Sequence, residues 1–407
     1  MKRLRLLFAP LGHFLSHRSR CLAVAEEMHA RGHEVALVCV PGEEALIAGR
    51  GLRAYPAYAM TPSTILAFGA PAAFQRRFHA NGWEDLIVHH RFGVEQMVAD
   101  DLAIYEDFQP DGVVWDGRPT SPVTACLQGL VAIGLNNLSM PFEDPRGDAS
   151  EERPATVQAA FQRELAQVLA PRIQASAVHA RFNRHLSWIV PGLPVTENPA
   201  KLGLLGDPVH TYVGPLHWRG WDVQPGPGER AVDGRPLALV TLGSTFPFPH
   251  VALAAAQALH GDGFDVILNM EALESADDLP AGVRVCPRLN LRACLAQAEL
   301  VVHHAGHGTT MEALRAGVPA VMLPFNGDQI DIARRMARLS CGVVLEGYPG
   351  DVGVRAIRAA VATLRGDSRY REQAGRFRDE LARWPDGAGL AADFIARRVP
   401  QIQELLR

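Results

Sequence analysis

The sequence predicts an α/β protein built from two doubly wound, Rossmann-like domains. Three observations predict it. The chain opens with a strand–helix–strand pattern, the same alternation restarts near residue 236, and a segment rich in proline and glycine separates the two. The chain has 407 residues, 48% of them hydrophobic, which is enough for two or three domains with cores of their own.

The first domain begins with residues 3–9, RLRLLFA, whose continuous apolar run is typical of a strand buried on both faces. Residues 19–32 carry apolar side chains at helical spacing and end at a glycine, and 33–40 are again apolar. A parallel strand–helix–strand unit this close to the start indicates an open α/β sheet. Further along, residues 111–116 predict another buried strand, and 123–134 predict the helix that follows it.

The second domain follows the proline- and glycine-rich segment, where periodicity is weak. Its strands are expected over residues 236–243, 264–270, 283–287, 299–306 and 318–324, and its helices over 250–261, 291–298, 309–317 and 328–342. The resulting division is an N-terminal domain at 1–213, a linker at 214–235, a C-terminal domain at 236–385 and terminal helices at 386–407, which could pack back on the N-terminal domain. We expect a central cleft between the domains, with ligands beyond the C-terminal strand ends.

Composition argues against several classes of protein. The net charge is −4 and no block of like charges occurs, so we expect no nucleic-acid partner. The six cysteines form no CxxC pair, which favours reduced thiols and a cytoplasmic location. The basic and then apolar start resembles a signal peptide, but Pro10 and Gly12 interrupt it early, and no other segment is apolar enough for stable membrane insertion.

The most informative segment is residues 301–329, VVHHAGHGTTMEALRAGVPAVMLPFNGDQ. It predicts a strand, a turn with Gly306 and Gly308, and a helix whose first turn carries Thr309 and Thr310. Free N–H groups at such a helix start suit a phosphate, and a carboxylate at Glu312 could take the two hydroxyls of a ribose. The alternative is an ordinary turn capped by a threonine, with the glutamate complementing the helix dipole.

This segment closely resembles the donor-nucleotide signature of the inverting glycosyltransferases of the GT-B fold, family 1. The matching residues are His304, Gly306, Thr309, Thr310, Glu312, Gly317-Val318-Pro319, Pro324 and Asp328-Gln329. The resemblance implies that His304 and the turn from Gly306 to Thr310 hold the diphosphate. It also implies that Glu312 binds the ribose and that Asp328 and Gln329 bind hydroxyls of the donor sugar.

Two further segments resemble the same family. Residues 240–245, VTLGST, resemble its first C-terminal-domain strand and loop, which implies that Ser244 and Thr245 lie near the diphosphate. Residues 283–291, VRVCPRLNL, resemble the loop that packs on the nucleobase. Arg288 stands there in place of the family's glutamine and could stack its guanidinium on the base, or simply be solvated.

An inverting sugar transfer needs a base for the acceptor hydroxyl, and histidine suits that role near neutral pH. In the family, the catalytic histidine precedes a Gly-His-x-Val segment by sixteen residues, and counting back from His33 gives His17 rather than His13. We expect Ser16 to cap the helix that begins near His17, and His13 to shape the acceptor pocket. Arg20 stands where the family usually has proline.

Asp116 is the expected partner of the base. It ends the strand at 111–116, and family members have an aspartate after an apolar strand at a similar point. A carboxylate there would orient the histidine and stabilise its charged form. The alternative role is that of a turn or helix cap, for which Thr120 or Ser121 is the better candidate.

The acceptor is expected to contact aromatic and apolar side chains in residues 57–95 and 140–190, although core packing is an equally good explanation for each. These candidates are Phe78, Trp83, Phe92, Met140, Phe142 and Phe182. The resemblance implies a UDP- or dTDP-sugar as co-substrate, a small lipophilic natural product as acceptor, and no cofactor or metal. A homodimer is compatible with it. The alternatives are a nucleotide-sugar epimerase of the same fold and a catalytically idle relative that binds a partner.

Overall fold

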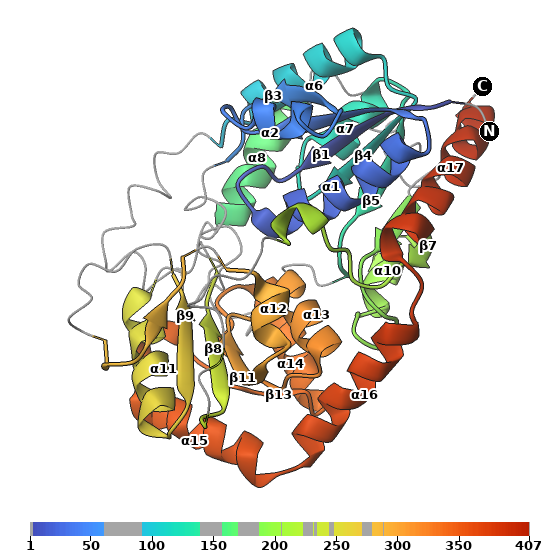
Figure 1. The fold of residues 1–407 in the computed structure, drawn as a ribbon. Coiled ribbons are helices and arrows are strands. Elements are labelled where there is room, and N and C mark those ends of the chain that lie inside the picture. Colours follow the sequence, from blue (N-terminus) through green and yellow to red (C-terminus); the bar gives the residue numbers. More distant parts are fainter. Residues whose placement is uncertain are drawn as a thin grey trace. The chain divides into compact units, whose positions relative to one another are not determined.

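The fold is taken from a computed structural model of the chain. It describes residues 3–60, 92–138, 157–169, 187–204, 206–222, 231, 234–243, 248–270, 279–287 and 289–406. The chain forms two compact units (Figure 1). Unit 1 comprises residues 1–138, 145–218 and 385–407, and unit 2 comprises 139–144 and 219–384. Each unit contains one parallel sheet, which confirms the predicted α/β class with two Rossmann-like domains.

Unit 1 contains a seven-stranded sheet in the order β3-β2-β1-β4-β5-β6-β7. Its strands are β1 (Arg5–Pro10), β2 (Glu34–Cys39), β3 (Arg53–Pro56), β4 (Gly112–Asp116), β5 (Val131–Leu135), β6 (Ser187–Val190) and β7 (Val209–Tyr212). Its helices are α1 (Leu15–Ala30), α2 (Glu44–Ala48), α6 (Val94–Phe108), α7 (Ser121–Leu127), α8 (Val157–Leu169), α10 (Ala200–Leu204) and α17 (Gly387–Leu406).

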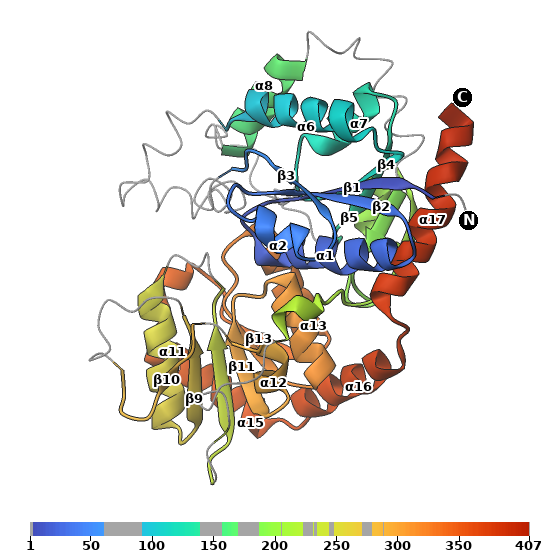
Figure 2. The ribbon, with the colours of Figure 1, turned by 45° about the horizontal axis from the view of Figure 1, so that its top comes forward.

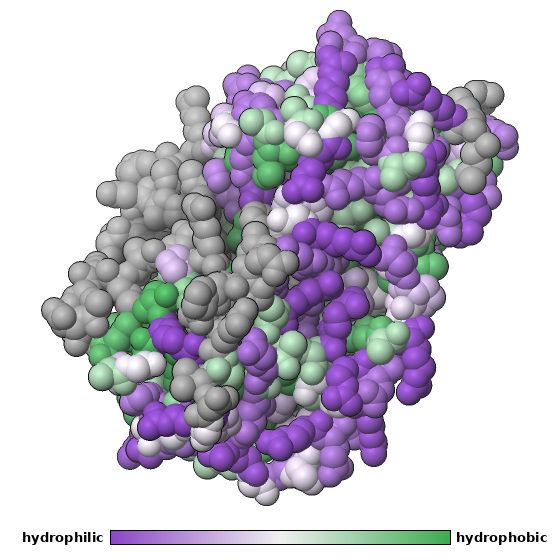
Figure 3. Space-filling model, in the orientation of Figure 1, coloured by the Kyte–Doolittle hydropathy of each residue, from purple (hydrophilic) through white to green (hydrophobic). Residues whose placement is uncertain are grey.

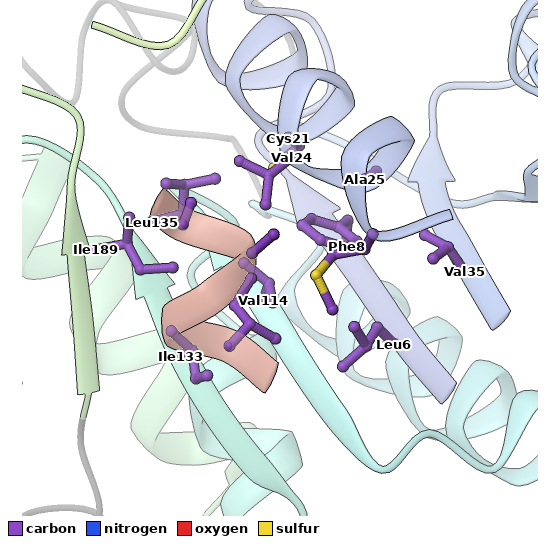
Figure 4. Packing of buried hydrophobic residues seen from close by; sticks show 14 of the residues in the cluster. Leu6, Phe8, Cys21, Val24, Ala25, Val35, Val114, Ile133, Leu135 and Ile189 are labelled. Atoms are coloured by element: carbon purple, nitrogen blue, oxygen red, sulfur yellow. The ribbon is translucent and has the colours of Figure 1, made fainter. Parts of the chain in front are cut away.

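Helices cover both faces of this sheet, as Figure 2 shows for α1 on one side and for α6 and α7 on the other. Side chains of alternate residues of β1 lie on opposite faces of the sheet. Leu6 and Phe8 pack with α1 and α17, while Leu7 and Ala9 pack with α6 and α7. Figure 4 shows the first of these cores, with Phe8 among side chains of α1 and of neighbouring strands. The continuous apolar run at residues 3–9 therefore reflects burial on both sides.

Two local predictions in unit 1 are wrong. The helix expected over 123–134 ends at Leu127, because Gly129 takes a positive φ of 68° and the chain turns into β5. The segment from Val131 onward is buried and pairs with β4, so sheet pairing overrides its helical spacing. Helix α1 begins before Ser16, with Phe14 at the N-cap and no side-chain cap.

Unit 2 contains a six-stranded sheet in the order β10-β9-β8-β11-β12-β13. Its strands are β8 (Leu237–Thr241), β9 (Asp265–Asn269), β10 (Arg284–Val285), β11 (Ala298–His303), β12 (Ala320–Met322) and β13 (Gly342–Val344). Its helices are α11 (Pro249–Gly261), α12 (Leu291–Leu295), α13 (His307–Ala316), α14 (Gly327–Arg338), α15 (Val354–Gly366) and α16 (Arg369–Arg383), with short 3₁₀ turns η3 (Arg219–Trp221) and η6 (Pro349–Asp351). The helix expected over 328–342 stops at Arg338, because Gly342 starts a strand that pairs with β12.

The C-terminal segment returns to unit 1 as the single helix α17, which tolerates Pro400 within it. Ile395 and Val399 are buried in the same core as α1, and Arg31, the C-cap residue of α1, donates to Asp393 at 2.6 Å. In unit 2, α16 presents a row of charged residues to solvent, and Figure 3 shows a hydrophilic surface there. Among the described residues, no helix combines the length and apolarity needed to cross a bilayer.

Candidate active site

The sheet of unit 1 brings His17 and Asp116 together at its C-terminal edge. Strands β1 and β4 are neighbours in register, so Asp116 at the end of β4 lies beside Pro10 at the end of β1, just before α1. The Nδ1 atom of His17 lies 2.5 Å from Oδ1 of Asp116. Asp116 is fully buried, whereas 19% of the His17 side chain is exposed. The predicted pair is therefore assembled from residues 99 positions apart.

Glycine is required beside this pair. Gly117 has a φ of 78°, which side-chain-bearing residues rarely adopt. A β-carbon there would lie 3.0 Å from Cε1 of His17 and 3.0 Å from Cβ of Leu11. The backbone of Leu11 is held in place by its N–H bond to the Asp116 carbonyl, at 2.7 Å. The turn after β4 therefore leaves room for the imidazole only because residue 117 lacks a side chain.

Arg20 also contacts the carboxylate of Asp116 and donates to both of its oxygens. Its Nε donates to Oδ2 and its Nη2 to Oδ1, each at 2.8 Å. Burial of the carboxylate acts to raise the pKa of Asp116, but the charge of Arg20, followed by that of His17, outweighs it and lowers the pKa below the usual value. Because an ionised carboxylate only accepts hydrogen bonds, Nδ1 of His17 carries the hydrogen that it shares with Asp116. The other ring nitrogen, Nε2, is then left as a proton acceptor.

His13 stands apart from this pair. It is exposed, and within the described part of the chain no hydrogen bond joins it to His17 or Asp116. Its pKa is lowered by partial burial of the ring, and then by the nearby positive charge of Arg18. His13 therefore stays neutral near pH 7, and its predicted role in the acceptor pocket remains a prediction.

In unit 2, the turn between β11 and α13 has the local features of an anion site. Gly306 caps α13 without a side-chain bond, so the first-turn N–H groups have no intrahelical partner. Ala305, just before it, is buried with a φ of 61°. Thr310 is buried, and its hydroxyl donates to the carbonyl of Gly306 at 2.9 Å, while its place in the donor site stays a prediction. Gly308 and Thr309 lie in the first turn of the helix.

His304 lies between two glycines. A β-carbon at Gly306 would collide with its ring, and one at Gly243 would lie 2.8 Å from its Cε1. Burial lowers the pKa of His304 to about 4, although a hydrogen bond with the backbone of Thr241 acts in the opposite direction. Burial, and then the neighbouring His304, lower the pKa of His303 to about 3. His304 is therefore a neutral ring that could donate one N–H to a phosphate oxygen.

The remaining donor residues already have protein partners. Glu312 is buried and receives two hydrogen bonds from Arg292, at 2.8 and 3.1 Å from its two oxygens. Gln329 is the N3 residue of a capping box, and its Oε1 accepts from the backbone N–H of Phe325 at 2.8 Å. Asp328 lies beside it in the first turn of α14. Sequence reasoning missed Arg292 and this capping role, although Asn326 three residues before Gln329 was a readable signal.

Several predicted site residues lie outside the described residues. They are Phe78, Trp83, Met140, Phe142, Phe182, Ser244, Thr245 and Arg288. Phe92 is described and is a core residue, packed with Met97 and Val98 of α6. Over the described ranges, no three or more histidine, cysteine, aspartate or glutamate side chains are grouped so as to hold a metal ion.

Parts of the chain are similar in sequence to known proteins. Residues 253–396 match the family model described as the C-terminal domain of erythromycin biosynthesis protein CIII-like proteins. The chain is 33% identical over 193 residues to demethyllactenocin mycarosyltransferase of Streptomyces fradiae, across 46% of this chain and 41% of that protein. It is 30% identical over 167 residues to TDP-daunosamine transferase DnrS of Streptomyces peucetius, across 39% and 38%. The matched stretches thus span about two fifths of each relative.

The fold comparison covers nearly the whole chain. The crystal structure of the calicheamicin glycosyltransferase CalG4 superposes with a TM-score of 0.70 at 23% identity, over 99% of this chain and 100% of that one. At that identity the likeness concerns the fold. The chain therefore shares the two-sheet fold of this glycosyltransferase, and its residues 253–396 are similar to the C-terminal domain of erythromycin biosynthesis protein CIII-like proteins.

Proposed function

We propose that the chain is an inverting glycosyltransferase, which moves a sugar from a nucleoside-diphosphate donor to a hydroxyl of a small lipophilic acceptor. The observation that carries the proposal is the family match at residues 253–396, which contains the predicted donor motif at 301–329. The relatives reported above bear transferase names. Unit 1 supplies the base in this proposal, and unit 2 supplies the donor site.

The chemistry assigned to unit 1 is proton removal. Nε2 of His17 takes the proton of the acceptor hydroxyl as its oxygen attacks the anomeric carbon of the sugar. The bond between that carbon and the diphosphate oxygen breaks, and the nucleoside diphosphate leaves with the electron pair. Attack opposite to the leaving group inverts the anomeric configuration. The buried carboxylate of Asp116 stabilises the imidazolium that forms, through the bond at 2.5 Å.

The chemistry assigned to unit 2 is donor binding. In this proposal the helix start at α13 and the neutral ring of His304 face the growing negative charge of the leaving diphosphate. A dTDP-sugar is the donor to test first, because the relative from Streptomyces peucetius is named for a TDP-sugar. Natural-product biosynthesis is the setting that the same relatives support.

The test combines product formation with nucleotide binding. The full chain is incubated with dTDP-glucose or UDP-glucose and a panel of aliphatic and phenolic natural-product alcohols, and products are detected by mass spectrometry. His17→Ala should reduce transfer to an aliphatic hydroxyl at least about 100-fold, while calorimetry shows dTDP or UDP bound as in wild type. A change of the sugar without any acceptor would instead indicate an epimerase. Full turnover by His17→Ala would refute the assignment of the base.

A further inference from the structure

Arg20 is the residue near the base that the proposed chemistry has not used. It lies on α1 one turn after His17, so the two side chains share a helix face. Only 4% of it is exposed. Its guanidinium donates one hydrogen bond to each oxygen of Asp116, a bidentate contact that we call the fork. Nη2 also lies 3.0 Å from Nδ1 of His17 and 3.5 Å from Oδ1 of Asn136. Proline, usual at this position in the family that the sequence resembles, could make none of these contacts.

The fork determines which atom of the pair holds the shared hydrogen. Asp116 has no exposed surface, so without a positive partner its carboxyl group would hold a proton. A protonated carboxyl would donate to Nδ1 of His17, and the ring hydrogen would then sit on Nε2. That tautomer cannot accept a proton from an acceptor hydroxyl. With Arg20 in place, the carboxylate accepts from Nδ1–H, and Nε2 remains unprotonated.

Other described groups near the pair carry no charge. Asn136, which follows β5, places its Oδ1 3.5 Å from Nη2 of Arg20, and the ring of Phe14 lies edge-on to that of His17 with 6.0 Å between the ring centroids. Burial, followed by the charge of Asp116, raises the pKa of the Cys21 thiol well above its usual range, so Cys21 stays neutral beside the pair.

We propose that Arg20 is a positioning residue that, through Asp116, fixes the neutral His17 ring as the Nδ1–H tautomer, in which Nε2 is the acceptor. The inference rests on the proposed function, in which His17 is the base. The geometry that carries it is a bidentate contact of Arg20 with the carboxylate, at 2.8 Å to each oxygen, together with the distance of 2.5 Å between Nδ1 of His17 and Oδ1 of Asp116. In this tautomer the approach of 3.0 Å between Nη2 of Arg20 and Nδ1 of His17 is a contact between two N–H groups and adds no hydrogen bond.

The test reads the His17 ring directly and needs no substrate. Long-range ¹H–¹⁵N spectra of the full chain labelled with ¹⁵N-histidine report the tautomer of each neutral ring, and the signals absent from His17→Asn identify His17. We expect the Nδ1–H tautomer in wild type. In Arg20→Gln, the Nε2–H tautomer should become the major form of the neutral His17 ring. Arg20→Lys keeps a positive charge beside Asp116 and should keep the Nδ1–H tautomer.

A matched control separates charge from general damage. Arg118 is also a buried arginine paired with a buried aspartate of unit 1, since its Nε donates to Asp101 at 2.8 Å. The charges that act on Asp116 are those of Arg20 and His17, so Arg118→Gln should leave the tautomer of the His17 ring unchanged. An unchanged tautomer in Arg20→Gln, or the same change in Arg118→Gln, would overturn the proposal.

Kinetics provide a second readout. Arg20→Gln should lower kcat at least about tenfold, with KM for the nucleotide sugar changed less than about threefold, because orientation of the base is lost while donor binding is not. If Arg20→Gln does not fold, Arg20→Lys decides, since it loses the fork and should lower kcat at least about threefold; wild-type kcat there would overturn the positioning role. The His17 spectra remain informative even if no donor is turned over. A failure of the proposed function can therefore be distinguished from a failure of the inference about Arg20.

Discussion

Replacing Gly117 by alanine should disable the proposed base without unfolding the protein. Alanine at a φ of 78° carries a backbone strain of about 1–2 kcal/mol. Its methyl group would lie 3.0 Å from both His17 Cε1 and Leu11 Cβ, where carbon atoms prefer about 3.5–4.0 Å. Leu11 is held through its backbone bond to Asp116, so the imidazole must move, by about 0.5–1 Å. A displacement of that size can lower kcat by up to about 100-fold.

Gly129 provides the matched control for this substitution. It lies in the same unit at a φ of 68°, and a β-carbon there would meet nothing within 4 Å. Urea unfolding should show that Gly117→Ala and Gly129→Ala both lose about 1–2 kcal/mol of unfolding free energy. Only Gly117→Ala should lose kcat in the transfer assay with dTDP-glucose. An equal loss of kcat in both variants, or none in Gly117→Ala, would refute the geometric reasoning.

Two further substitutions test the charges and the donor turn. Asp116→Asn should cost about 3–5 kcal/mol at pH 7, because it leaves a buried arginine unpaired. Since folding lowers the pKa of Asp116, its stabilisation is complete above about pH 4 and is lost as the pH falls further, so the difference in unfolding free energy between wild type and variant should shrink only below about pH 4 in urea titrations. Gly306→Ala should weaken dTDP binding at least about tenfold in calorimetry, because the methyl group displaces His304, whereas Gly375→Ala, with open space around it, should not.

The elements that could be predicted from sequence are those whose pattern is set by burial. The run at residues 3–9 is apolar because both faces of β1 are covered, and the spacing of residues 19–32 is helical because one side of α1 packs on the sheet. The segment at 123–134 misled because its apolar residues fit a helix and a strand equally well. Only pairing with β4 decides for β5, and pairing is not a local property.

The contact between His17 and Asp116 could be predicted in part. The sixteen-residue spacing of the family that the sequence resembles selects His17 by its distance from His33, and Asp116 ends a recognisable strand. The first residue of a helix is harder to predict. Helix α1 begins at Leu15 and has no side-chain cap, so Ser16 lies inside the helix instead of capping it. The bonds of Gln329 to the backbone near Phe325 show that a motif residue can also have a structural role within its own turn.

The role of Arg20 could not be predicted from the sequence, because it depends on a contact between distant residues. The departure from proline at this position is visible in the sequence, but its meaning depends on a carboxylate 96 residues away. An arginine on an amphipathic helix is most often solvated, and nothing local to α1 indicates that this one is buried. The sheet order decides it, because placing β4 beside β1 brings Asp116 under the first turns of α1. Once the carboxylate is buried there, a positive partner is needed to keep it ionised, and Arg20 is the arginine in contact with it.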